Sequence, residues 1–150
     1  MMTAADPTSG RDRAERGHRA LPHTADLRIE AWAPTREGCL AEAVAATVEA
    51  FADPAGARPS REHLVELGGA GAEDRLVALL DEVVYRLDSA GEVPVATEVT
   101  WLPEGLRVRL AMADAASLAV TGAVPKAVTW HRLEFGGGPS GWRCAVTLDV

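Results

Sequence analysis

The chain has 150 residues, of which 47% are apolar and only 5% aromatic, so it fits one domain with a core built mainly from Leu, Val and Ala. Its 22 acidic residues outnumber its 15 Lys and Arg residues and give a net charge of −7, which argues against a protein that grips nucleic acid directly, because phosphate binding needs a concentrated basic surface. No apolar run approaches the ~20 residues that span a membrane, and the N-terminus lacks an apolar signal core, so we expect a cytoplasmic protein.

Residues 1–20 are polar, rich in Ala, Arg, Asp and Gly, and lack periodicity, which predicts a disordered tail ahead of one folded domain over residues 21–150. The alternation of Leu27, Ile29 and Ala31 with polar residues predicts the first strand. A turn then leads to Thr35, a candidate helix N-cap. The helix that follows carries one apolar stripe, made of Leu40, Val44, Val48 and Phe51.

A second helix is predicted over residues 73–87, because its wide apolar face is typical of a helix that packs on a sheet. The remaining periodic segments predict a short strand and two hairpins, over residues 63–67, 93–102, 106–113, 126–135 and 142–150. Two helices with about six mostly antiparallel strands in one sheet give an α+β domain. Cys39 and Cys144 both fall on apolar faces, so we expect two buried free thiols.

Two carboxylates share the same orientation on the first and last predicted strands. Asp26 and Asp149 both lie opposite the apolar faces of their strands, so they converge if these strands are neighbours. With the α-carboxylate of Val150 they would form an acidic group that needs a bound cation, and oxygen ligands suit a hard ion such as calcium or magnesium. The alternative is that Asp26 caps a turn and Asp149 is merely exposed.

Three motifs resemble the archease pattern, in the right order across the foldable chain. They are His23–Asp26 (HTAD) before the first strand, Lys126–His131 (KAVTWH) in the penultimate strand, and the final Asp149–Val150. The Leu-rich segment Leu76–Asp88 resembles the second helix of that family. The segment 114–125 departs most from the family, which puts the details of partner docking in doubt.

The resemblance implies an accessory protein of an RtcB-type RNA ligase, not an enzyme, with no catalytic residues of its own. That ligase uses GTP and divalent metal to join RNA ends through a guanylylated histidine, and archeases promote its guanylylation and multiple turnover in tRNA splicing or RNA repair. The resemblance also implies a divalent-cation site, usually taken as calcium, made by Asp26, Asp149 and Val150.

Three further side chains are candidates for contact with the partner or the cation. Lys126 is the only lysine beside 14 arginines, and a compact ammonium suits a phosphate or carboxylate of the partner, although a solvated strand-end lysine explains it equally well. His23 and His131 lie in matched motifs and are ligand or general-base candidates, or structural histidines bonded to the backbone.

Two other functions remain open at this point. A metal-dependent hydrolase would use Asp26, Asp149, His23 and His131, but it needs an open metal position and a concave pocket. No HExxH, GxSxG or P-loop motif supports it. A chaperone-like interaction module acting through an apolar surface is the third hypothesis.

Overall fold

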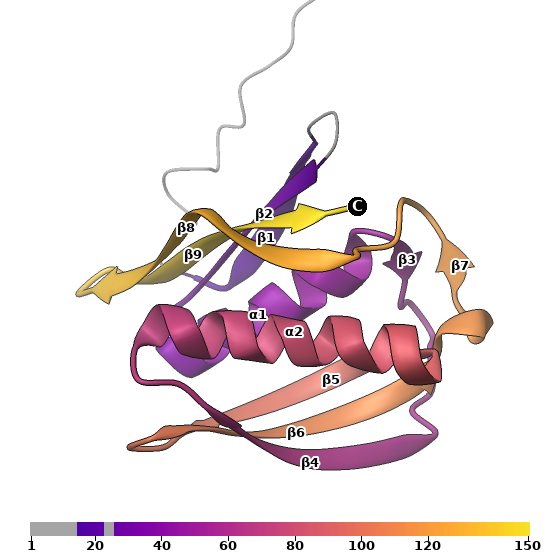
Figure 1. Cartoon of the computed structure of the whole chain (residues 1–150), viewed down its shortest axis with the longest axis horizontal. Coiled ribbons are helices and arrows are strands. Elements are labelled where there is room, and N and C mark those ends of the chain that lie inside the picture. Colours follow the sequence, from indigo (N-terminus) through magenta and orange to yellow (C-terminus); the bar gives the residue numbers. More distant parts are fainter. Residues whose placement is uncertain (1–14, 23–25) are drawn as a thin grey trace, which may run out of the picture.

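The computed structural model describes residues 15–22 and 26–150 and arranges them in three layers (Figure 1). Two helices, α1 (Arg36–Glu49) and α2 (Ala72–Ala90), form the middle layer. One outer layer is a four-stranded sheet in the order β1 (Gly17–Pro22), β2 (Asp26–Ala33), β9 (Gly141–Asp149) and β8 (Ala127–Gly138). The other is a three-stranded sheet in the order β4 (Arg61–Gly68), β6 (Gly105–Asp114) and β5 (Glu92–Trp101). The short strands β3 (Ala52–Asp53) and β7 (Ala119–Val120) pair with each other, and a 3-10 turn, η2 (Ala115–Ser117), precedes β7.

This architecture confirms the predicted α+β class, but the strands form two main sheets where we expected one. The reason lies in α1, which contacts β2 on one side and β5 on the other. Besides the predicted apolar stripe, its small residues Gly38, Ala43 and Ala46 are buried as well. A helix that is apolar nearly all round needs cover on both sides, and small side chains let both sheets approach.

Strand β1 corrects the predicted tail, which is wrong for residues 17–20. These residues pair with β2, beginning at Gly17 opposite Trp32. A Cβ atom on Gly17 would lie 2.5 Å from Cζ2 of Trp32, so the indole packs where only glycine leaves room. β1 is an edge strand held by polar contacts, and hydrophobic periodicity therefore gave no signal for it. Residues 1–14 lie outside the described part of the chain.

The core fills both spaces between the helices and the sheets. One cluster of almost completely buried residues joins the layers; it includes Ile29 and Leu148 of the four-stranded sheet, Leu40 and Leu79 of the helices, and Leu110 of the three-stranded sheet. Thr35 is the helix N-cap as predicted, and its Oγ1 accepts a hydrogen bond of 3.0 Å from the amide of Gly38. Cys39 and Cys144 are buried free thiols, which confirms the sequence prediction.

One buried charge, Arg75 in the first turns of α2, holds the loop before this helix to the β5–β6 turn. Its side chain is only 4% exposed, and the guanidinium donates four hydrogen bonds to main-chain carbonyls. The acceptors are the carbonyls of Gly69, Leu102, Pro103 and Gly105, at 2.7–3.1 Å from the donor nitrogens. The guanidinium also lies 4.4 Å from the ring centroid of Trp101.

In the part of the chain described, neither helix is long and apolar enough to cross a membrane.

Candidate functional site

Asp26, Lys126 and Asp149, one residue from each motif segment, meet at one end of the four-stranded sheet, where the chain end beyond β9 is marked C in Figure 1. The antiparallel register of β2 and β9 sets Asp26 directly opposite Asp149. Directly opposed residues of an antiparallel pair project from the same face of the sheet, with Cα atoms about 4.5–5.5 Å apart. The condition set by the sequence, that the first and last predicted strands be neighbours, is therefore met.

Strand β8 brings Lys126 to the same end from the other side of β9. The amide of Lys126 donates a 2.7 Å hydrogen bond to the main-chain carbonyl of Asp149, and Ala127 is the register partner of Asp149. The side chain of Lys126 is exposed, and that of Val150 is partly exposed just beyond β9. One end of the sheet thus gathers two carboxylates and the single lysine of the chain.

The two predicted histidines fare differently from the carboxylates. His23 lies outside the described residues. His131 is exposed on a bulge of β8, where residues 130–133 stand against Val146 alone, because Thr129 pairs with Thr147 and Glu134 with Ala145. That position is three residues along β9 from Asp149, or roughly 10 Å. The hydrolase hypothesis required His131 to lie beside the carboxylates, and the register does not place it there.

Ion pairs occupy the rest of the sheet face that carries Asp26 and Asp149. Arg28 is 6% exposed, and its guanidinium donates to Oγ1 of Thr147 at 3.2 Å and to Oε2 of Glu134 at 3.1 Å. Arg143 also donates to Glu134, at 2.9 Å. Asp26 and Asp149, in contrast, form no side-chain hydrogen bond or ion pair with another residue of the described segments. Their charges are balanced by no neighbour within those segments.

The carboxylate pair suits a hard divalent cation in donor type but supplies only part of a coordination shell. Calcium takes six to eight oxygen ligands, drawn from carboxylates, main-chain carbonyls and water. Within residues 15–22 and 26–150, no group of three or more His, Cys, Asp or Glu side chains lies close enough to hold a metal ion. The two carboxylates at this end of the sheet therefore form a partial site, which further oxygen ligands would have to complete.

A separate polar cluster ties β1 to α1 and was missed because it begins in the predicted tail. The ring nitrogens of His18 lie 2.6 Å from Oε1 of Glu42 and 2.8 Å from Oε1 of Glu49, and Arg16 also pairs with Glu42. Burial acts to lower the pKa of His18, but the hydrogen bonds to Glu49 and Glu42 outweigh it and raise this pKa above its ordinary value of 6.5. These contacts hold an edge strand on a helix.

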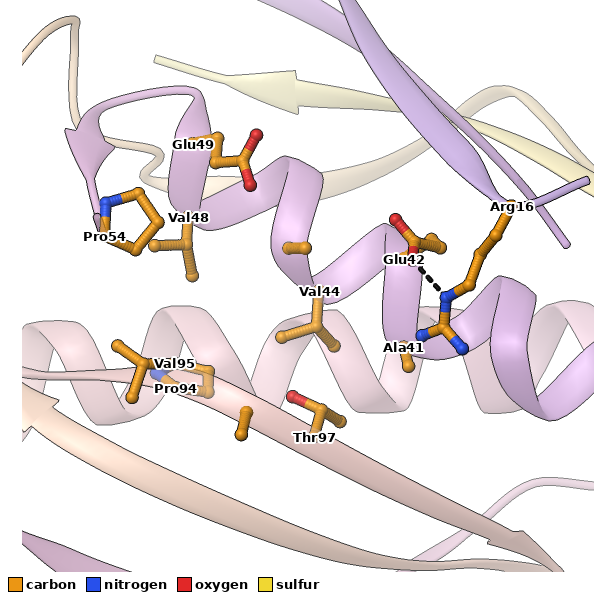
Figure 2. A pocket seen from close by; sticks show the side chains of 12 residues that line it. Arg16, Ala41, Glu42, Val44, Val48, Glu49, Pro54, Pro94, Val95 and Thr97 are labelled. Carbon is orange, nitrogen blue, oxygen red and sulfur yellow. Dashed lines mark hydrogen bonds and ion pairs between the residues drawn. The ribbon is translucent and has the colours of Figure 1, made fainter. Parts of the chain in front are cut away.

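Figure 2 shows the pocket next to this cluster, a space of about 190 Å³ between α1 and β5. Val44, Val48 and Val95 line its apolar part, and Glu42 turns toward Arg16 at one end. Because the carboxylate of Glu42 is already paired with Arg16 and His18, the polar groups at this rim serve the fold.

Glu92, at the start of β5, is a buried carboxylate whose charge is also paired. It is 2% exposed and pairs with Arg61 and, at 3.0 Å, with Nε2 of His63. Burial acts to raise the pKa of Glu92, but the hydrogen bonds from His63 and Arg61 prevail and lower it below its usual value. This cluster joins β4 to β5, the two strands that flank β6.

Comparison with known sequences decides the family. The Archease protein family (MTH1598/TM1083) matches residues 18–150, which is nearly the whole described chain. The chain belongs to the archease family. The match begins within β1 and includes all three motif segments.

Two archease relatives illustrate how far the similarity extends. A probable archease of Mycobacterium tuberculosis is 50% identical over 142 residues, covering 95% of this chain and 79% of the relative. The archease of Archaeoglobus fulgidus is 28% identical over 140 residues, covering 89% of this chain and 98% of the relative. The archease sequence pattern is therefore shared by a bacterial and an archaeal protein.

Solved structures show the same fold at low sequence identity. The solution structure of Methanobacterium thermoautotrophicum protein 1598 has a TM-score of 0.69 and 21% identity, and covers 89% of this chain and 99% of its own. The crystal structure of a Thermotoga maritima archease, described as a possible chaperone, has a TM-score of 0.62 and 19% identity, with coverage of 88% and 96%. The three-layer arrangement is thus the archease fold.

The segment that departs from the archease pattern, residues 114–125, is anchored by a small core of its own. Leu118 packs in a cluster with Phe51, Val48 and Val93. The amide of Thr121 donates a 2.8 Å hydrogen bond to the carbonyl of Phe51. Leu118 therefore packs at the end of α1, and the segment then leads directly to Lys126.

Proposed function

We propose that this archease is a non-catalytic accessory protein that binds a divalent cation and activates an RtcB-type RNA ligase, promoting its guanylylation and multiple turnover in tRNA splicing or RNA repair. Family membership supports the proposal, and the observation that carries it is the β2–β9 register, which sets Asp26 opposite Asp149. Two like charges so placed repel each other unless a cation binds between them or a proton is taken up.

Calcium is the cation proposed, held by the carboxylates of Asp26 and Asp149 and by the carboxylate of Val150. Oxygen donors of this kind favour calcium or magnesium over zinc. A bound cation would neutralise this end of the sheet and join β2 to β9. The protein's own part is to hold the two aspartates in register, through main-chain pairing that continues from Asp26–Asp149 to Ala33–Trp142.

Lys126 is proposed to contact an acidic group of the ligase or a phosphate bound to it. Its amide is fixed by the carbonyl of Asp149, while its side chain is exposed and forms no ion pair within the described residues. The main chain of Lys126 is thus fixed beside the proposed cation site, and its ammonium is exposed and available to a partner. This arrangement suits a partner that carries a negative group next to the surface that contacts the cation site.

Activation is proposed to work by differential binding. An accessory protein that binds the guanylylation-competent state of the ligase more tightly than the other state shifts the ligase toward it. Release after guanylylation lets one accessory molecule serve several ligase molecules, so the effect is expected at substoichiometric amounts. No catalytic side chain of this protein is needed for either step.

The test is transfer of radiolabelled GMP from GTP to the ligase of the same organism, with and without this protein, together with the number of ligations per enzyme molecule. Both are expected to rise with the protein present, and to fall again for Asp26→Ala and Asp149→Ala. Glu104→Gln, an exposed charge change in the β5–β6 turn, serves as the control. Equal labelling and equal turnover with and without the wild-type protein would end the proposal.

A further inference from the structure

A groove of about 620 Å³ lies between α2 and the segment that leads into β8. Figure 1 shows α2 running along the sheet that contains β8. Lys126 belongs both to the groove and to the end of the sheet where β9 finishes, because its side chain lines the groove and its amide is bonded to Asp149. The groove and the carboxylate pair are therefore neighbouring parts of one surface.

The helix wall of the groove, formed by five residues of α2, includes an exposed stripe of two aspartates with a tyrosine between them. Asp81, Tyr85 and Asp88 follow one another at spacings of four and three, which places them along one face of α2. Tyr85, the only tyrosine of the chain, is 61% exposed. On the opposite wall Val124 is 46% exposed, so two sizeable apolar surfaces face solvent within one groove.

The carboxylates of this stripe differ from that of Glu82 on the same helix in having no ion-pair partner within the described residues. Glu82, beside Asp81 in sequence, pairs with Arg86 at 2.7 Å. Asp81 and Asp88 form no ion pair or side-chain hydrogen bond with any residue of the described ranges 15–22 and 26–150. Partial desolvation raises the pKa of the Asp81 carboxyl above its ordinary value. A cation supplied from outside would relieve that cost.

We propose that this groove binds an arginine-bearing segment of the partner ligase, an inference that rests on the proposed function. A guanidinium pairs with carboxylates in its plane and stacks on an aromatic ring. It can therefore pair with Asp81 or Asp88 while it stacks on Tyr85. An aliphatic side chain next to that arginine would cover Val124. Lys126, at the end of the groove, donates to a carboxylate of the same segment and so sets the direction in which that segment binds.

Charge complementarity favours a basic protein segment over the other occupants. The groove carries two carboxylates against one ammonium, on a chain of net charge −7, which repels the phosphates of RNA. A second copy of this acidic chain would likewise bring like charges together. A positively charged segment of an RNA-binding enzyme meets neither obstacle, and its approach is accelerated by the opposite charge.

The experiment measures the affinity of the full-length protein for the ligase by calorimetry, at low and at physiological salt. The double variant Asp81→Asn/Asp88→Asn is expected to weaken binding roughly tenfold at low salt and to lose much of the salt dependence. Tyr85→Ala is expected to weaken it by about tenfold or more, as a central aromatic contact would. The matched control is Glu73→Gln/Glu104→Gln, which removes the same charge at exposed sites away from the groove. All variants change exposed side chains, and thermal unfolding verifies that they fold.

Each outcome separates the two proposals. If the wild-type protein binds and activates the ligase but the Asp81/Asp88 variant behaves as the control does, the groove is not the docking site and the proposed function stands. If the wild-type protein neither binds nor activates the ligase, both fail. A change in self-association by sedimentation, or in the binding of a single-stranded RNA oligonucleotide, that is specific to the groove variants would assign the groove to another occupant and overturn the inference.

Discussion

Replacing Asp149 by Asn tests the cation site through two effects of opposite sign. Asp26 and Asp149 are cross-strand partners, and like charges directly opposite each other destabilise an antiparallel pair by roughly 0.2–1 kcal/mol. Because the side chain of Asp149 is exposed, solvent screening places the effect toward the lower end of that range. Without divalent cations, Asp149→Asn is therefore expected to raise the free energy of unfolding by about 0.5 kcal/mol, or Tm by about 1–2 °C.

Calcium is expected to reverse that order. A cation at about 100 times its Kd stabilises the native state by about 2.7 kcal/mol, which for a domain of this size is a rise in Tm of roughly 5–10 °C. The wild-type protein gains this stability and the variant loses most of it. The assay is thermal unfolding in chelator and at graded calcium concentrations, with Glu104→Gln as a control of equal charge change. A variant that is less stable than wild type in chelator, or that gains as much from calcium, refutes the reasoning.

Three further predictions concern other parts of the molecule. Arg75→Leu leaves one fully buried and three partly buried carbonyl contacts unmade, so we expect a loss of roughly 3 kcal/mol, measured by denaturant unfolding; a loss below about 1 kcal/mol would mean that water replaces the guanidinium. The raised pKa of His18 contributes stability that is fully present below the unfolded value of 6.5 and is lost as pH rises through the folded value. Between pH 6 and about pH 8.5, the free energy of unfolding is therefore expected to fall less in His18→Gln than in wild type, and equal declines contradict this. Lys126→Ala is expected to reduce ligase activation while changing stability by less than about 1 kcal/mol, and Lys126→Arg to restore it partly, as read by GMP transfer and thermal unfolding; full activity of the alanine variant would mean that the side chain is only solvated.

The elements that follow a simple period were predictable from the sequence. Leu27 to Ala33 alternates because one face of β2 covers α1, and the Leu-rich face of α2 repeats at helical spacing because it lies on a sheet. The facing of Asp26 and Asp149 away from the apolar side also followed from this alternation. Their direct opposition did not, because strand order and register depend on contacts between distant segments.

What the sequence did not disclose depends on polar or long-range contacts. Arg75 interrupts an otherwise apolar helix face, and only the carbonyls of the β5–β6 turn explain its burial. His18 holds β1 through two glutamates of α1, a contact that no local pattern signals. The bulge in β8 likewise moves His131 away from Asp149, although the two motifs lie on adjacent strands. The sequence therefore indicated which way these side chains face, but not which of them lie close together.

The position of β9 determines when the proposed cation site can form. β9 comes last in chain order among the described strands, yet it lies inside the sheet, between β2 and β8. Pairing it with β2 closes a loop through nearly the whole chain, and such long-range closure is slow compared with local structure. During synthesis a growing chain presents Asp26 long before Asp149 exists. The proposed cation site can therefore form only after β9 has been synthesised and has paired with β2.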